Sequence, residues 1–311
     1  MKRTVLAVVL MALGVAACAS AEADVATSAV AAEGPDTTTA AAAVPATTAE
    51  TTTTQVATTT VPPETTTTTM VTTTTESPYA RPAWLGTRLL PLRSDDFGEV
   101  QPTPPEMVDR RFETLDLLPP PNGDTFTSTL GPIPEDVLMR SSWREDCPVG
   151  VDDLVYLTVT HYGFDGEFHT GEMIVNAAVG QDIVGVFREL HAARFPIEQM
   201  RVITAEEIDA HPTGDWNDTT SFVCRPAVGS GRWSQHAYGL AIDINPFHNP
   251  YLKGDLVLPE LASAYLDRSE VRPGMIISRD VVDQAFASIG WTWGGRWNSL
   301  KDWMHFSRNG N

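Results

Sequence analysis

Two short segments of the chain carry side chains whose types and spacing suit metal chemistry. His236 and Asp243 are seven residues apart with Gly239 between them, and Asp302 and His305 are three residues apart further along the chain. Two histidines and one carboxylate form a ligand set that binds zinc and leaves a fourth position open for water, as catalytic zinc sites do. The spacing therefore predicts an open zinc site.

The residues around Asp243 support this interpretation. Residues 240–242 are apolar and predict a buried strand that ends on the acid. A lone buried carboxylate is costly, so Asp243 needs a metal ion or an arginine as its partner. Asp302 and His305 are close enough in the chain to face the same centre.

Together the two segments resemble the zinc peptidases that act on peptidoglycan. The family pattern is Ser-x-His-x-x-Gly-x-Ala-x-Asp, followed later by an acid three residues before the final His, and residues 234–243 and 302–305 match it at every position. The family includes D-alanyl-D-alanine carboxypeptidases, D-Ala-D-Ala dipeptidases and L-alanyl-D-glutamate endopeptidases. The resemblance covers residues 141–311. The Phe-x-Cys-Arg sequence at 222–225 and the Trp-Gly-Gly sequence at 293–295 are similar to its carboxypeptidase-like branch.

The resemblance implies a role for each of these residues. The ligands of Zn²⁺ would be His236, Asp243 and His305. Asp302 would be the general base that takes a proton from the attacking water and passes it to the leaving amine. Many family members have Glu at this position, and Asp also occurs. Arg225 is placed like the substrate arginine of the family, where it would hold a carboxylate or stabilise the oxyanion. Arg232 is the alternative, because it lies closer to His236 in the chain.

We therefore predict a zinc metallopeptidase that hydrolyses peptidoglycan stem peptides, most similar to a D-alanyl-D-alanine carboxypeptidase. An L-alanyl-D-glutamate endopeptidase would use the same zinc core. A non-catalytic zinc-containing cell-wall binding lipoprotein is a further alternative, because the hedgehog signalling domain resembles this family without being a peptidase. A purely structural wall-tethering lipoprotein would not need the ligand set. The presence of Asp302 favours an enzyme.

The elements expected to position these residues follow from hydrophobic periodicity. Alternating or helical patterns predict strands at 154–162, 167–179 and 200–204 and helices at 181–195 and 278–289. The expected fold is α+β, with a small antiparallel sheet and flanking helices around the zinc site, of the hedgehog/DD-peptidase kind. Trp291, Trp293 and Trp297 would either form the floor of a peptide cleft or belong to the core.

The chain before this domain divides into three parts. Residues 1–17 have a basic start and a short apolar run, which is typical of an export signal. The small residues before Cys18 resemble a bacterial lipoprotein signal, and an ordinary secretory signal is the alternative. Residues 18–80 form a Thr-, Ala- and Pro-rich tether that we expect to be disordered. Residues 81–140 form a Pro-rich, irregular arm, and residues 141–311 form the peptidase domain.

Charge and cysteine content limit the partners of the protein. The formal net charge is −19, which argues against binding to nucleic acid or to anionic lipid head groups. Acylated Cys18 would instead anchor the protein to the lipid bilayer, on the extracytoplasmic side of a bacterial cell envelope. In an exported protein, Cys147 and Cys224 are expected to form a disulfide, and two free thiols are the alternative. We expect a monomer.

Overall fold

A long antiparallel hairpin underlies the fold in the computed structural model, which describes residues 77–311. Strands β2 (Leu154–Tyr162) and β3 (Phe168–Asn176) pair along their whole length. The predicted strand at 154–162 is confirmed to the residue; Leu157 and Val159 are buried in the main core, and Leu154 is buried in a second cluster. The second strand is shorter than predicted. The signal segment, Cys18 and the tether up to residue 76 lie outside the described residues.

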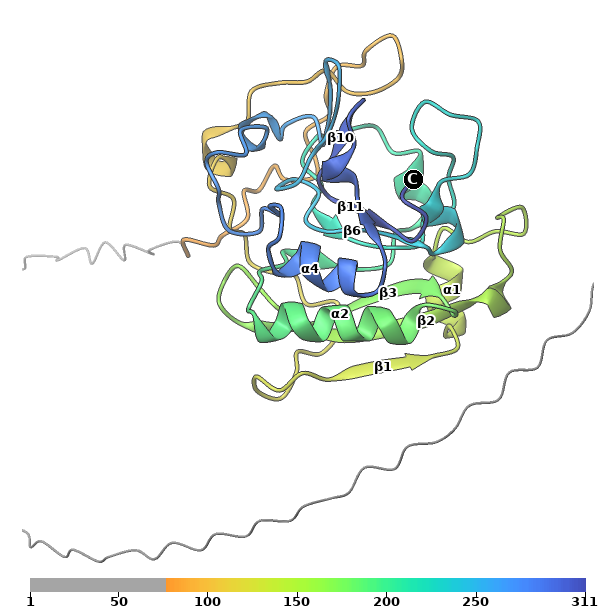
Figure 1. Ribbon diagram of the computed structural model, residues 1–311. Helices are drawn as coiled ribbons and strands as arrows, with labels where there is room; N and C mark the ends of the chain where they lie inside the picture. The colour runs from red at the N-terminus through yellow and green to blue at the C-terminus, as the bar shows by residue number, and fades with distance from the viewer. Residues whose placement is uncertain (1–76) are drawn as a thin grey trace, which may run out of the picture. The chain divides into compact units, whose positions relative to one another are not determined.

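One helix lies on this hairpin and a second helix packs against the first (Figure 1). Helix α2 (Gly180–Ala192) packs on β2 and buries Ile183, Phe187 and Leu190, and α4 (Val281–Ser288) packs beside α2. The helical spacing at 181–195 and 278–289 thus predicts both helices, whose ends differ by a few residues. No helix within residues 77–311 is long and apolar enough to cross a membrane.

Small sheets take the place of the single sheet predicted from the sequence. In the first, β1 (Ser128–Gly131) extends the β2–β3 hairpin. The second has the order β6-β11-β9 and the third β10-β7-β8, and both are antiparallel. Their strands are β6 (Ala241–Asp243), β7 (Tyr251–Lys253), β8 (Leu256–Leu258), β9 (Thr292–Trp293), β10 (Lys301–Asp302) and β11 (His305–Ser307).

The strand predicted at 200–204 is largely wrong. Only Met200 belongs to a strand, in the parallel pair of β4 (Gln199–Met200) and β5 (Asp218–Thr219). Thr204 instead precedes the short helix α3 (Ala205–Ile208), and its backbone N–H donates to the Glu207 carboxylate at 2.9 Å. A capping interaction at this point ends the extended chain. The fold is thus α+β, with a parallel strand pair in addition to the antiparallel sheets.

The main hydrophobic core lies between the two helices and the first two sheets. Phe286 of α4 stacks on Phe306 of β11 with ring centroids 4.1 Å apart. Trp291 and Trp293 are buried in the same core. Of the two interpretations of these tryptophans, the core one therefore applies to Trp291 and Trp293. The core fixes β11 against α4, so it also holds the strand that carries His305.

The arm at 81–140 is less irregular than predicted. Its second half contains β1 and helix α1 (Glu135–Arg140). Strand β1 forms because the outer edge of β2 presents backbone groups that need partners. The first half contains one short 3₁₀ turn, Pro105–Met107, and is otherwise without helix or strand apart from an isolated bridge.

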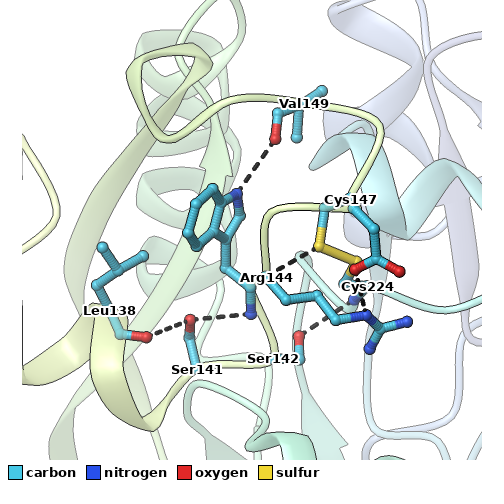
Figure 2. Close-up of a disulfide and its surroundings, with 9 residues drawn as sticks. Leu138, Ser141, Ser142, Arg144, Cys147, Val149 and Cys224 are labelled. Atoms are coloured by element: carbon cyan, nitrogen blue, oxygen red, sulfur yellow. Dashed lines mark hydrogen bonds and ion pairs between the residues drawn. A yellow bond between two sulfur atoms is a disulfide. The ribbon is translucent and has the colours of Figure 1, made fainter.

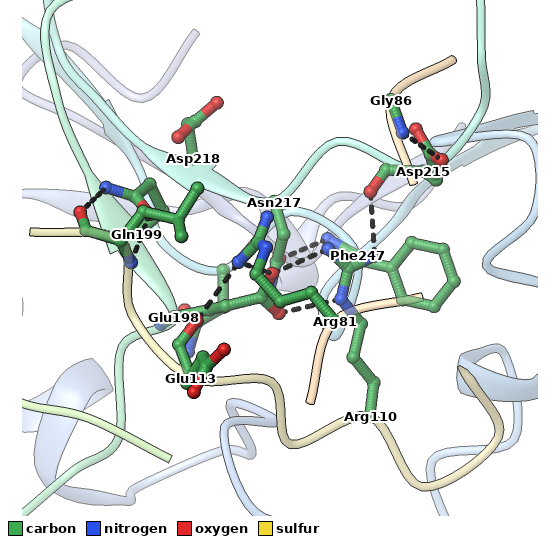
Figure 3. Close-up of polar contacts among 12 residues, drawn as sticks. Arg81, Gly86, Arg110, Glu113, Glu198, Gln199, Asp215, Asn217, Asp218 and Phe247 are labelled. Atoms are coloured by element: carbon green, nitrogen blue, oxygen red, sulfur yellow. Dashed lines mark hydrogen bonds and ion pairs between the residues drawn. The ribbon is translucent and has the colours of Figure 1, made fainter. Parts of the chain in front are cut away.

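A buried ion pair fastens the first half of the arm to the rest of the fold (Figure 3). Arg110 donates two hydrogen bonds to the carboxylate of Glu198, each 2.7 Å long, and a third to the carbonyl of Asp215. Both charged side chains are 1% exposed. Asn217 also donates to Glu198, and the Arg110 guanidinium lies over the Phe247 ring. This set of contacts satisfies the buried charges, so the arm packs on the domain as part of its structure.

A disulfide joins the segment after α1 to the segment before Arg225 (Figure 2). Cys147 and Cys224 are bonded, with their Cα atoms 5.8 Å apart, and they close a loop with a sequence separation of 77 residues. Nearby, the Cys224 N–H donates to the Ser142 hydroxyl, and the Trp143 indole donates to the Val149 carbonyl. In the chain-entropy model a loop of this size stabilises the fold by about 4 kcal/mol.

Candidate metal centre

A single 3₁₀ turn positions His236. The turn spans Gln235–Tyr238, and the Ser234 hydroxyl caps it by accepting from the His236 backbone N–H at 3.3 Å. The chain then reverses at Gly239, which has a φ of +63°. A Cβ at this glycine would lie 2.6 Å from the backbone nitrogen of Asn176, so only glycine fits. In the Ser-x-His-x-x-Gly motif, the serine thus caps the turn and the glycine allows the chain to reverse beside Asn176.

Strand pairing brings Asp243 and His305 together. The two residues are direct cross-strand partners in β6 and β11. His305 Nδ1 lies 3.1 Å from Asp243 Oδ1, and His236 Nε2 lies 3.2 Å both from Asp243 Oδ2 and from His305 Nδ1. All three side chains are buried. Among the described residues, this is the one group of histidines, cysteines and acids whose ligand atoms converge for a metal ion.

The outer ring nitrogens of both histidines are occupied. His236 donates Nδ1–H to the Ser221 carbonyl at 2.6 Å, and His305 donates Nε2–H to the backbone oxygen of Asn311 at 3.1 Å. In neutral rings this leaves His236 Nε2 and His305 Nδ1 as lone pairs that face the Asp243 carboxylate. In these tautomers three acceptors face one another with no donor between them, an arrangement that a bound cation would stabilise. Outer acceptors of this kind orient metal-binding histidines in general.

The pKa shifts in the group agree with this interpretation. Burial opposes ionisation of Asp243, yet His236 and His305 hold the pKa of its carboxyl well below the usual range. Burial also opposes protonation of His305, but the hydrogen bond and charge of Asp243 raise the pKa of that imidazole. Both shifts show that the group favours positive charge beside the Asp243 carboxylate. The donor set of two imidazoles and one carboxylate fits Zn²⁺.

Asp302 lies on β10, outside this group. It pairs with Tyr251 of β7, and its Oδ1 is screened from solvent without a hydrogen-bond partner among residues 77–311. Burial raises the pKa of Asp302 to about 7; the charge of Asp243 raises it further, whereas His305 and Arg225 oppose the shift. An orphaned carboxyl oxygen with a pKa near neutrality is suited to accept and release a proton.

Arg225 follows the disulfide directly and is half-buried. Its guanidinium donates to the neighbouring Pro226 carbonyl at 3.2 Å, and its charge acts on Asp302. Arg232, the alternative named from the sequence, is exposed. Arg225 is thus the arginine whose charge reaches the site, although no contact joins it to the three converging ligands.

Several groups that support this centre could not be predicted from residue types. The acceptors of the histidine N–H groups are backbone oxygens of Ser221 and Asn311, and every residue type has a backbone oxygen. Gly294 belongs to the Trp-Gly-Gly sequence at 293–295, whose pattern does not indicate what the glycine contacts. A Cβ there would lie 2.6 Å from the Asp302 carbonyl oxygen, so this glycine lets β10 approach.

The fold and the site together define an α+β protein with a buried His-Asp-His group of metal-binding type. Residues 228–308 match the family model described as D-alanyl-D-alanine carboxypeptidase, so this segment is similar to that family. The resemblance predicted from the sequence is thereby confirmed over these residues. The match contains His236, Asp243, Asp302 and His305, and Arg225 lies just before it. No curated protein and no solved structure matches the chain at a significant level.

Proposed function

We propose that this protein is a zinc-dependent metallopeptidase that hydrolyses peptidoglycan stem peptides as a D-alanyl-D-alanine carboxypeptidase does. The proposal rests on three hydrogen-bond acceptors that face one another: one ring nitrogen of each histidine and the Asp243 carboxylate. The N–H group of each histidine donates to a backbone oxygen outside the group. The other ring nitrogen of His236 and of His305 therefore faces the Asp243 carboxylate with a lone pair. The family match over residues 228–308 supports the substrate class.

The proposed ligands of zinc are His236, Asp243 and His305. When bound, zinc would supply Lewis-acid chemistry, which polarises a scissile carbonyl and lowers the pKa of water. A set of three protein ligands would leave one coordination position for water, as in catalytic zinc sites. The buried, apolar surroundings of the ligands strengthen the electrostatic effect of a bound cation.

Asp302 is proposed to move the proton. As the water oxygen forms its bond to the carbonyl carbon, Asp302 accepts the proton that the water loses. It then delivers that proton to the amine nitrogen as the C–N bond breaks, so the products are a carboxylate and a free amine. A pKa near neutrality suits both halves of this transfer, and a bound cation nearby would favour the ionised form that begins it.

Arg225 is proposed to bind the carboxylate of the substrate. Its charge acts on Asp302, so a carboxylate held by Arg225 would lie near the proton-transferring group. A guanidinium binds a carboxylate through two parallel hydrogen bonds, which orients the peptide as well as attracting it. The disulfide at Cys224 restrains the backbone beside this arginine.

We also propose that the protein acts at the cell envelope as a lipoprotein. The support comes from the sequence: the export signal at 1–17, Cys18 after small residues, and the Thr-rich segment at 18–80. Two or more acyl chains on Cys18 would anchor the protein stably, where one chain would not. The intervening residues would allow the peptidase domain to reach the cell wall.

Digestion of purified muropeptides by the protein with zinc, with and without a chelator, tests the enzymatic proposal. We expect chelator-sensitive release of D-alanine, detected by mass spectrometry of the products. Cleavage between L-alanine and D-glutamate would instead assign the endopeptidase activity, since both reactions use the same ligand set. Absence of both products from zinc-loaded protein would contradict the peptidase and favour a binding role.

A further inference from the structure

We propose that residues 308–311, here called the tail, and Trp297 form a brace that holds His305 in its metal-binding orientation. Trp297 is then a positioning residue that acts through the tail. The inference rests on the proposed function, because it concerns how tightly the centre binds zinc. It assigns a role to the second tryptophan of the Trp-Gly-Gly-Arg-Trp sequence, which the mechanism does not use.

Two hydrogen bonds connect Trp297 to His305 through adjacent tail residues. The Trp297 indole Nε1–H donates to the Gly310 carbonyl at 3.1 Å. The backbone oxygen of the next residue, Asn311, accepts the Nε2–H of His305, also at 3.1 Å. The rings of Trp297 and His305 lie directly beside one another, with centroids 5.5 Å apart. The indole therefore packs beside the ring of His305 and also holds the tail residue next to the one that accepts from this ring.

Trp297 is itself held at its backbone. Its N–H donates to the Gly294 carbonyl at 3.1 Å, which closes the 3₁₀ turn Gly294–Arg296. The Lys301 ammonium donates to the Trp297 carbonyl at 2.7 Å and to the Gly295 carbonyl at 3.2 Å. These bonds fix the position from which the indole reaches the tail.

The tail makes one further contact with the sheet of the centre. The Arg308 N–H donates to the Leu240 carbonyl at 3.1 Å, which continues the pairing of β11 with β6. The chain then turns at Gly310, with a φ of +79°. Asn311 is exposed and, with residues 296–299 and Gly310, lines an open hollow of about 640 Å³. Water can therefore compete for the Asn311 backbone oxygen unless Trp297 holds the tail in place.

The brace keeps the ring proton of His305 on Nε2. With Nε2–H bound to the Asn311 backbone oxygen, Nδ1 is a lone pair that faces Asp243 and His236. If that oxygen moved away, the proton could shift to Nδ1, where it would oppose a cation. Loss of an outer partner of a metal-binding histidine typically weakens metal binding 10- to 100-fold. Trp297 acts one hydrogen bond further out, so we expect about a tenfold effect, at the lower end of this range.

The test is the zinc affinity of Trp297→Phe, measured by competition with a chromophoric chelator. Phenylalanine keeps a ring beside His305 but has no N–H for the Gly310 carbonyl. We expect zinc affinity to fall about tenfold, and the visible spectrum of the Co²⁺-substituted variant to differ from that of the wild type. Trp143→Phe is the matched control, because it removes an indole–carbonyl bond of the same 3.1 Å length at Val149. The control should bind zinc as the wild type does.

Nitrogen-15 NMR of the histidine rings in the wild type tests the same idea without a substitution. We expect a hydrogen-bonded proton on Nε2 of His305 and on Nδ1 of His236. An unprotonated Nε2 on His305, or an unchanged zinc affinity in Trp297→Phe, would overturn the brace while leaving the proposed function intact. Failure of the wild-type protein to bind zinc would contradict the proposed function itself.

Discussion

Asp243 and His305 face each other across the β6–β11 pair, and their side chains meet at 3.1 Å although 62 residues separate them in the chain. Direct cross-strand partners in an antiparallel pair project to the same side of the sheet. His236 reaches the same point from the 3₁₀ turn before β6. The register of one short strand pair therefore decides whether the three proposed ligands converge.

Substitution of Asp302 separates metal binding from proton transfer. Asp302→Asn keeps the shape of the side chain and removes its ability to accept a proton. We expect turnover of muropeptides to fall by at least about 100-fold, since general acid–base catalysis contributes 10²–10⁴-fold. Zinc content should stay at the wild-type level, because Asp302 is outside the group of three ligands. Wild-type turnover in this variant would remove Asp302 from the mechanism.

Substitution of Gly294 by alanine should displace Asp302, because the added methyl group would collide with the backbone of that residue. The Cβ of Gly294→Ala would lie 2.6 Å from the Asp302 carbonyl oxygen and 3.0 Å from its Cβ. A displacement near 1 Å can reduce turnover by about 100-fold, and we expect the loss mainly in kcat, with zinc binding retained. Gly131→Ala is the control, because nothing lies within 4 Å of the added methyl group there. Equal activity in the two variants would show that the approach of β10 does not matter.

Removal of Arg110 should destabilise the whole described fold. Arg110→Met leaves the Glu198 carboxylate buried without its main partner, and breaking a buried pair in this way costs about 3–5 kcal/mol. Chemical denaturation followed by tryptophan fluorescence measures the change in unfolding free energy. Arg111→Met is the matched control, because the Arg111–Asp109 pair is exposed and such pairs contribute at most about 1 kcal/mol.

The double variant Arg110→Met/Glu198→Gln tests the reason for that loss. It removes both charges, so it should be more stable than Arg110→Met alone. If the double variant were the less stable of the two, an uncompensated charge would not explain the effect of Arg110→Met.

The same ion pair predicts a loss of stability in acid. Burial opposes ionisation of Glu198, but the charge and hydrogen bonds of Arg110 lower the pKa of its carboxyl below the usual value of 4.5. The unfolded chain therefore binds this proton at a higher pH than the folded chain. The contribution is fully present above about pH 5 and decreases as the pH falls through 4.5 toward the lower folded pKa. Unfolding free energies at pH 7, 5, 4 and 3 measure it.

The charge-free double variant provides the comparison for this pH series. Other carboxyls with lowered pKa values, such as Glu172 and Asp165, remain in both proteins. The decrease in unfolding free energy between pH 5 and pH 3 should therefore be smaller in Arg110→Met/Glu198→Gln than in the wild type. Parallel curves would mean that Glu198 does not contribute to the acid sensitivity.

Long elements were predictable because their patterns repeat. The alternation at 154–162 predicts β2 to the residue, and helical spacing predicts α2 and α4. Strands of two or three residues, such as β9 and β10, are too short for any period to emerge, so the second and third sheets were not predictable as separate units. Strand β1 lay in a Pro-rich segment, and its pairing depends on the exposed edge of β2 rather than on its own pattern.

The residue types and local spacing in the sequence predicted His236, Asp243 and His305, which the structure brings together, because each half of the motif lies within a few residues of chain. The role of Asp302 stays a prediction. Tertiary structure alone decided how the halves meet: the β6–β11 register, the two backbone oxygens that orient the histidines, the glycine behind Asp302 and the buried pair of Arg110 with Glu198. The physical reason is that spacing is a property of the local chain, whereas contacts between distant residues depend on which packing buries the apolar surface and satisfies every buried polar group.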